Sequence, residues 1–174
     1  SITDPLTGLY NRRYFNKIFM GEINRALRSN QSLTFLIIDI DHFKLYNDNY
    51  GHDKGDVLLQ ALAEQFKASL KRSNEFIFRI GGEEFGVIYS GLSKEESMAH
   101  AQEICDSIAD MKIEHDYSYP LKILTVSIGH FYATKGDLLQ GNQIFHNADQ
   151  ALYFAKENGR NRVEDYDEVI NDRT

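Results

Sequence analysis

The apolar run from Leu33 to Ile40 constrains the fold of this chain more than any other segment. Apolar side chains follow one another there almost without a break, which is typical of a strand that is buried on both faces. Asp39 interrupts the run near its end, and Asp41 comes two residues later. A carboxylate that closes an apolar strand costs free energy unless it is solvated, paired or bound to a cation. The run alone leaves open whether Asp39 is an ordinary residue at the sheet edge or a ligand.

Helical and strand-like patterns alternate along the rest of the chain. Apolar residues at helical spacing predict helices at 15–27, 54–70, from Ser93 onward and 147–157. Gly159 is a stop signal for the last of these helices. A loop with a short helix is expected at 41–53, and further strands at 76–80, 85–89, 121–128 and 163–166. This order predicts an α/β (α+β) fold in which helices flank a mixed central sheet of about five strands.

Charge and cysteine content narrow the classes of function. The chain has 26 acidic residues against 19 lysines and arginines, and its formal net charge is -7. Surfaces that bind nucleic acids are usually basic, so no DNA or RNA partner is expected. An acidic domain that handles an anionic nucleotide must gather its positive groups locally or recruit metal ions. Cys105, the single cysteine, is expected to be a small buried residue, and it fits a reducing, cytoplasmic location.

The tetrapeptide Gly81-Gly82-Glu83-Glu84 lies between two of the expected strands and predicts a hairpin. The two glycines allow a tight turn and close approach by a ligand. The adjacent carboxylates repel each other, and a hard cation such as magnesium would offset that repulsion. If the strands are neighbours, Asp39 and the hairpin glutamates meet as a two-metal phosphoryl-transfer site requires. An ordinary acidic hairpin is the alternative.

Four segments of the chain resemble the motifs of one known family. They are DPLTGLYNRR at 4–13, DIDHFKLYNDNYGHDKGD at 39–56, GGEEF at 81–85 and ADQALYFAKENGRNRV at 148–163. Over essentially its whole length, the chain therefore resembles the GGDEF domains of diguanylate cyclases. The resemblance implies one domain over 1–174 with a palm-like nucleotidyl-cyclase fold and GGEEF on a β-hairpin. Because the chain opens abruptly at Ser1, we expect it to be cut from a longer sensor protein with an upstream sensory domain, whose membrane attachment stays open.

The resemblance also implies roles for individual residues. Asp39, Glu83 and the backbone carbonyl of Ile40 are expected to ligate Mg²⁺, with Mn²⁺ as a substitute. Glu83 or Glu84 is expected to act as the general base, and the sequence does not separate this role from metal ligation. Base-reading positions follow in the next motif: Asn47 and Asp56 should recognise guanine, and His52 either contacts substrate or simply faces solvent at a helix start.

Positive and backbone groups are expected around the triphosphate. The loop of His42, Phe43 and Lys44 should direct backbone amides toward the β- and γ-phosphates. Lys44, Lys156 and Arg160 should add positive charge, and because Lys156 and Arg160 are four residues apart near a helix end, we expect them to share one face. A solvated basic helix terminus is the alternative.

The implied reaction joins two GTP molecules into cyclic di-GMP. Magnesium polarises the α-phosphate, and the 3′-hydroxyl of a second GTP displaces pyrophosphate in line. Each domain in this family holds one GTP, so a two-fold homodimer is expected to be the productive species. Many relatives bind product at an Arg-x-x-Asp motif; here Arg72 is retained and Glu75 stands in place of Asp, so product inhibition at this pair stays open. A catalytically inactive module that senses GTP or cyclic di-GMP is the alternative function, and a generic acidic scaffold is a third.

Overall fold

The computed structural model describes residues 1–173 and contains one five-stranded mixed sheet in the order β2-β3-β1-β4-β5. The strands are β1 Leu33–Ile40, β2 Phe76–Arg79, β3 Glu84–Ser90, β4 Val126–Ala133 and β5 Arg162–Asp165. β1 is central and antiparallel to both β3 and β4, whereas β4 and β5 are parallel. Every residue of β1 is buried, as its continuous apolar sequence predicts. The predicted mixed sheet flanked by helices is therefore confirmed.

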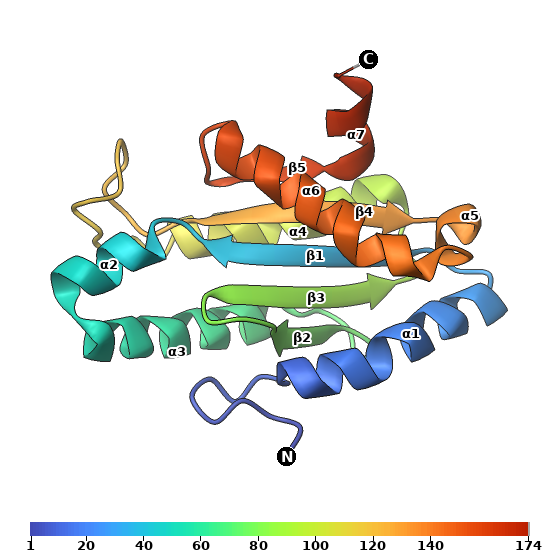
Figure 1. Ribbon diagram of the computed structural model, residues 1–174, viewed down its shortest axis with the longest axis horizontal. Coiled ribbons are helices and arrows are strands. Elements are labelled where there is room, and N and C mark those ends of the chain that lie inside the picture. Colours follow the sequence, from blue (N-terminus) through green and yellow to red (C-terminus); the bar gives the residue numbers. More distant parts are fainter. Residues whose placement is uncertain (174) are drawn as a thin grey trace.

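Helices cover both faces of the sheet, and each face has its own hydrophobic core. The helices are α1 Arg12–Arg28, α2 Phe43–Tyr50, α3 His52–Ser69, α4 Lys94–Ala109, α5 Lys135–Leu138, α6 Ile144–Glu157 and α7 Tyr166–Asn171, with a 3₁₀ turn at Gly141–Gln143. In Figure 1, α6 crosses in front of β1 and β4, and α4 lies behind them. Phe35 and Ile37 pack with α1 and α6, and Leu36 and Ile38 pack with α3 and α4. This alternation along β1 decides which face each later residue of the strand occupies.

Local sequence signals explain where the flanking helices begin. Asn11 caps α1, because its side-chain oxygen accepts the backbone N–H of Tyr14 at 2.9 Å. Ser93 and Glu96 form a reciprocal capping box at the start of α4, which confirms the predicted start at Ser93.

Cys105 is buried on helix α4. Among residues 1–173, no helix is both long and apolar enough to span a membrane.

Helix α6 approaches strand β4 closely at Gly129. A Cβ atom built there would lie 2.1 Å from the backbone oxygen of Ala148 and 2.4 Å from the backbone nitrogen of Leu152. Such distances are far inside van der Waals contact, so only glycine lets the backbone of α6 approach β4 this closely. Gly129 thereby sets the distance between the backbone of α6 and the sheet.

Two predicted boundaries are wrong. The strand expected at 121–128 runs from Val126 to Ala133 instead. Residues 113–125 form a folded excursion in which Glu114 bridges Ile123 and Lys122 has a left-handed φ of 57°. Before Val126, Leu121 is exposed and Leu124 belongs to the core on the α3 and α4 face, while Gly129 and His130 hide the second half of the strand from an apolar pattern. Helix α6 also begins at Ile144 rather than Asn147, and α7 has no counterpart in the prediction.

Candidate active site

The acidic end of β1 meets the hairpin between β2 and β3. Asp39 lies directly opposite Glu84 in the antiparallel pairing of β1 and β3, so both belong to the face covered by α1 and α6. The backbone N–H of Ile40 donates to the carbonyl oxygen of Glu83 at 3.3 Å. Gly81 leaves space for the side chain of Glu84, because a Cβ atom at this position would lie 3.1 Å from Glu84 Oε2. The structure therefore brings together Asp39 and Ile40 at the end of β1 and Glu83 and Glu84 at the start of β3.

The hairpin is held from outside the site by Arg79. Its guanidinium donates to the carbonyl oxygen of Gly82 at 2.8 Å and to the carboxylate of Asp4 at 3.1 Å. Asp4 in turn accepts the backbone N–H of Thr7 at 2.9 Å. The first of the four motifs thus supports the third through an ion pair between residues that are distant in sequence.

The three carboxylates of the acidic cluster, Asp39, Glu83 and Glu84, outnumber the two cations that act on it, Lys156 and Arg12. Lys156 Nζ lies 3.1 Å from Asp39 Oδ2, and the Asp39 residue is 6% exposed. The pKa of Asp39 is raised to about 6, because burial and the charges of Glu83 and Asp41 outweigh the opposing effect of Lys156. Burial also raises the pKa values of Glu83 and Glu84, with added repulsion from Glu84 on the first and from Asp39 and Asp149 on the second.

This excess of negative charge fits a magnesium ion. Within residues 1–173, no three His, Cys, Asp or Glu side chains converge into a complete set of metal ligands. Magnesium is usually held by one or two carboxylates and keeps waters and substrate phosphates as its other ligands. Asp39, Glu83 and the carbonyl of Ile40 match that incomplete set of hard oxygen donors. The ammonium of Lys156 marks the side of Asp39 on which a cation is favoured.

Lys156 and Arg160 do not share a helix face, so that expectation is wrong. Helix α6 ends at Glu157, and Gly159 follows with a φ of 112°, which confirms it as the predicted stop. Arg160 itself has a left-handed φ of 64°, and its N–H donates to Ala155 O at 2.9 Å. The chain reverses at this point. As a result Lys156 reaches Asp39, and Arg160 lines a different pocket together with His42.

The N-terminal end of α2 leaves its first backbone amides without a side-chain cap. His42 has a left-handed φ of 55°, and no side chain caps the helix. The first backbone N–H groups of α2 are therefore open to a ligand, and the helix dipole favours negative charge there. The Phe43 side chain is buried, so only its backbone could contact a phosphate, whereas Lys44 is exposed and pairs with Asp48 at 2.9 Å.

The expected base-reading residues flank the junction of α2 and α3. Asn47 Oδ1 is buried with no hydrogen-bond partner among the described residues. Its amide fills the space beside Gly55, where a Cβ atom would lie only 1.8 Å from Oδ1. Asp56, the next residue, is exposed on α3, and His52 is exposed at the first position of that helix. A buried acceptor without a partner is rare and suits a ligand that donates, as the guanine amine does.

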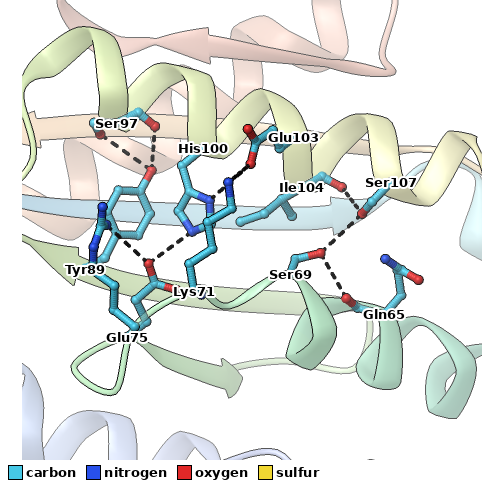
Figure 2. A network of polar contacts seen from close by, with 11 residues as sticks. Gln65, Ser69, Lys71, Glu75, Tyr89, Ser97, His100, Glu103, Ile104 and Ser107 are labelled. Carbon is cyan, nitrogen blue, oxygen red and sulfur yellow. Dashed lines mark hydrogen bonds and ion pairs between the residues drawn. The ribbon is translucent and has the colours of Figure 1, made fainter.

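Arg72 and Glu75 have separate environments. The Glu75 side chain is fully buried, where it accepts the backbone N–H of Lys71 at 2.8 Å and lies 3.2 Å from His100 Nε2 (Figure 2). Burial opposes its ionisation, but hydrogen bonds from His100 and Lys71 outweigh this effect and lower the pKa of Glu75. Arg72, 3.6 Å away, keeps 42% of its side chain exposed. Of the two residues, only Arg72 therefore faces solvent in this conformation.

Glu75→Gln should destabilise the fold by roughly 1–3 kcal/mol at neutral pH, because a buried charged hydrogen-bond network is lost. The pKa of Glu75 is lower in the folded chain, so its ionised form stabilises the fold above the unfolded pKa of about 4.3. That stabilisation disappears as the pH falls through the lowered pKa. Denaturant unfolding of both proteins from pH 7 to pH 3 should show the difference shrinking below about pH 4. If the difference in unfolding free energy between the two proteins stays constant over this range, ionised Glu75 is not stabilised by His100 and Arg72.

Two supporting residues of the site carry no recognisable signal in the sequence. Asp41 is 2% exposed and is satisfied by donors from distant segments. His115 is fully buried and contacts the carbonyl oxygen of His42 through Nε2 at 3.0 Å. Only the position of Asp41, two residues after Asp39, could have suggested that it faces the same side of the strand.

Comparison with known proteins identifies the family. The family model described as "Diguanylate cyclase, GGDEF domain" matches residues 1–162. The chain belongs to the GGDEF diguanylate cyclase family. A probable diguanylate cyclase of Escherichia coli K12, DgcC, is 37% identical over 94% of this GGDEF chain, which spans 43% of that relative.

Solved GGDEF domains have the same fold. The GGDEF domain of DgcB from Caulobacter crescentus, solved in complex with c-di-GMP, is 30% identical and has a TM-score of 0.85, with 96% of each chain covered. An active GGEEF domain of a diguanylate cyclase from Vibrio cholerae is 37% identical and has a TM-score of 0.76, covering 90% of this chain and 96% of that one. These likenesses confirm the predicted family and fold.

Proposed function

We propose that this domain is a diguanylate cyclase that condenses two GTP molecules into cyclic di-GMP and two pyrophosphates. The observation that carries the proposal is the meeting of Asp39 with Glu83 and Glu84 beside Lys156 at one sheet edge. The family relationship supports the same activity. The chain spans less than half of the curated relative described above, so we also propose that a sensory segment of a longer, cytoplasmically exposed parent protein controls this domain.

The proposed division of labour follows the positions of the side chains. Asp39, Glu83 and the Ile40 carbonyl would hold Mg²⁺, or Mn²⁺ in its place. When bound, the ion polarises the α-phosphate and makes the attacking 3′-hydroxyl easier to deprotonate. The raised pKa of Glu84 suits a proton acceptor close to the reacting groups, and Glu83 holds the ion.

The remaining residues bind and orient GTP. Asn47 and Asp56 read the guanine edge, and the open amides at 42–44 together with Lys44 and Arg160 hold the terminal phosphates. Lys156 neutralises charge beside Asp39 until substrate arrives, and then faces the phosphates. His52 lies at the margin of the base site. Because one domain binds one GTP, two copies must face each other for each 3′-hydroxyl to reach the other α-phosphate.

Product formation across a protein concentration series tests the proposal. With GTP and Mg²⁺, the specific activity of the domain should rise with protein concentration, because only the dimer is productive. A dimer enforced by a fused coiled coil should remove that dependence. If the enforced dimer binds GTP but yields no cyclic di-GMP, the catalytic proposal fails and a nucleotide-sensing module is favoured.

Asp56→Asn should weaken the preference for GTP over ATP on the order of tenfold or more, because the carboxylate can accept both donors of the guanine edge and adenine lacks that pair. The ratio of kcat/KM values for the two nucleotides measures this preference. Asp53→Asn is the matched control, since Asp53 is exposed on the first turn of the same helix. Unchanged discrimination in the Asp56 variant would remove this residue from base recognition.

A further inference from the structure

Two carboxylates close strand β1, and they have opposite surroundings. Asp39 faces the acidic cluster and is paired with Lys156. The carboxylate of Asp41 accepts the hydroxyl of Thr125 at 2.7 Å, the hydroxyl of Ser127 at 2.6 Å and the backbone N–H of Asn161 at 3.0 Å. These three donors occupy both oxygens of a residue that is only 2% exposed. Asp41 is therefore committed to the protein itself and has little capacity left for an ion.

The third donor belongs to a strained turn. Gly159, Arg160 and Asn161 have successive φ values of 112°, 64° and 48°. A left-handed conformation is unfavourable for a residue other than glycine, so the turn needs contacts that hold Arg160 and Asn161 in place. One is the bond from Arg160 N–H to Ala155 O, which closes the end of α6. The other is the charge-assisted bond from Asn161 N–H to Asp41, which ties the turn to the end of β1.

The turn sets where Arg160 stands relative to α2. Arg160, Asn161, Asp41 and His42 line one pocket. His42, at the N-terminal end of α2, lines this pocket together with Arg160, so Arg160 lies beside the start of that helix. Open helix amides and a guanidinium together suit the terminal phosphates of a nucleotide.

We propose that Asp41 is a positioning residue for triphosphate binding: it anchors the 159–161 turn so that Arg160 faces the phosphate end of the nucleotide at α2. This inference rests on the proposed function and adds a division of labour to it. Asp39 serves the ion at the reacting phosphate, and Asp41, two residues later, serves the terminal phosphates through Arg160. Asp41 then affects the affinity for a triphosphate and has little influence on recognition of the base.

Asp41→Asn tests the inference with two ligands that differ only in their phosphates. The amide keeps one accepting oxygen and loses the negative charge, so it cannot accept from all three donors and the bond to the Asn161 N–H is weakened. Calorimetry with Mg²⁺ should show roughly tenfold weaker binding of a GTP analogue whose α,β-bridging oxygen is a methylene, and unchanged binding of GMP. In turnover, KM for GTP should rise while kcat changes much less. Asp165→Asn is the matched control: Asp165 is a buried aspartate opposite His130, at the end of β5 away from Ser127, and its loss should leave the ratio of the two affinities unchanged.

A double-mutant cycle separates positioning from general loosening of the structure. Arg160→Ala alone should weaken binding of the triphosphate analogue. Adding Asp41→Asn to this variant should cause no further loss of affinity, because Asp41 acts through Arg160. Equal losses for both ligands, additive losses in the cycle, or wild-type binding by Asp41→Asn would each overturn the inference. If the wild-type domain bound neither ligand, the proposed function would fail, and this inference with it.

A second variant keeps the test valid if Asp41→Asn does not fold. Thr125→Val removes one of the three donors and keeps the carboxylate. It should give a smaller loss in the same direction, confined to the triphosphate analogue. Wild-type affinity of this variant for both ligands would count against the role of Asp41.

Discussion

Glu83→Gln should reduce the rate of cyclic di-GMP formation by a factor on the order of a thousand or more, with no comparable loss of stability. The amide keeps the shape of the side chain, but it removes the anionic charge that a hard cation requires. Glu83 is only partly buried in a turn, and its backbone carbonyl bond to Ile40 does not depend on the side chain. The fold should therefore survive while the ion is lost.

Chromatographic detection of product and thermal unfolding measure the two effects separately. Glu157→Gln is the matched control, because Glu157 is an exposed acid on the same helix as Lys156, and its loss changes the net charge equally. The control should retain wild-type turnover. Product formation by Glu83→Gln at the wild-type rate would show that the hairpin carboxylate does not hold the ion. A comparable fall in melting temperature and activity would mean that Glu83 is structural.

Gly129→Ala should have the largest effect on stability, about 3–5 kcal/mol or more. The added methyl group would lie within 2.1 Å of a backbone oxygen of α6, and backbone atoms cannot move aside as a flexible side chain can. Relief of the clash requires α6 to rise from the sheet. That movement would also draw Lys156 away from Asp39, so activity should fall in the fraction that remains folded.

Denaturant titration of the variant and of Gly136→Ala checks this expectation. Gly136 lies in the short helix α5, and a Cβ atom there would meet no atom within 4 Å. The control should match or slightly exceed the wild-type stability, because alanine favours a helix more than glycine does. If Gly129→Ala unfolds within 1 kcal/mol of the wild type, the packing of α6 against β4 is looser than the structure indicates.

The sequence predicts those parts of the fold whose signal is local. The predictions of a buried β1, of the stop at Gly159, of a helix start at Ser93 and of the glycine-led hairpin each depend on neighbouring residues, and each is confirmed. The predicted limits of β4 were wrong because Gly129 and His130 are accommodated in the strand by contacts with helices that are distant in sequence. Gly129 accommodates α6, and His130 bonds Ser97 of α4 at 2.7 Å.

The site shows the same division. The meeting of Asp39 with the hairpin follows from strand order, so the motifs could suggest it. The orientation of Arg160 could not be predicted, because a left-handed turn after α6 replaces the helical geometry that the four-residue spacing implied. The burial of Glu75 could not be predicted for a different reason, since its partner His100 lies on α4, 25 residues further along the chain. Pairwise contacts across the fold are therefore what the sequence pattern lacks.

The ion pair of Lys156 with Asp39 has a consequence for the resting domain. An internal ammonium balances the most deeply buried acid of the cluster without any help from solution. This pairing offsets the charge of Asp39 within the folded chain, in contrast to a zinc finger, whose fold needs its metal. Under the proposed function, an incoming nucleotide would offer the lysine a new anionic partner and would bring a replacement cation for the aspartate. Substrate binding would then exchange counterions at a site that is already folded.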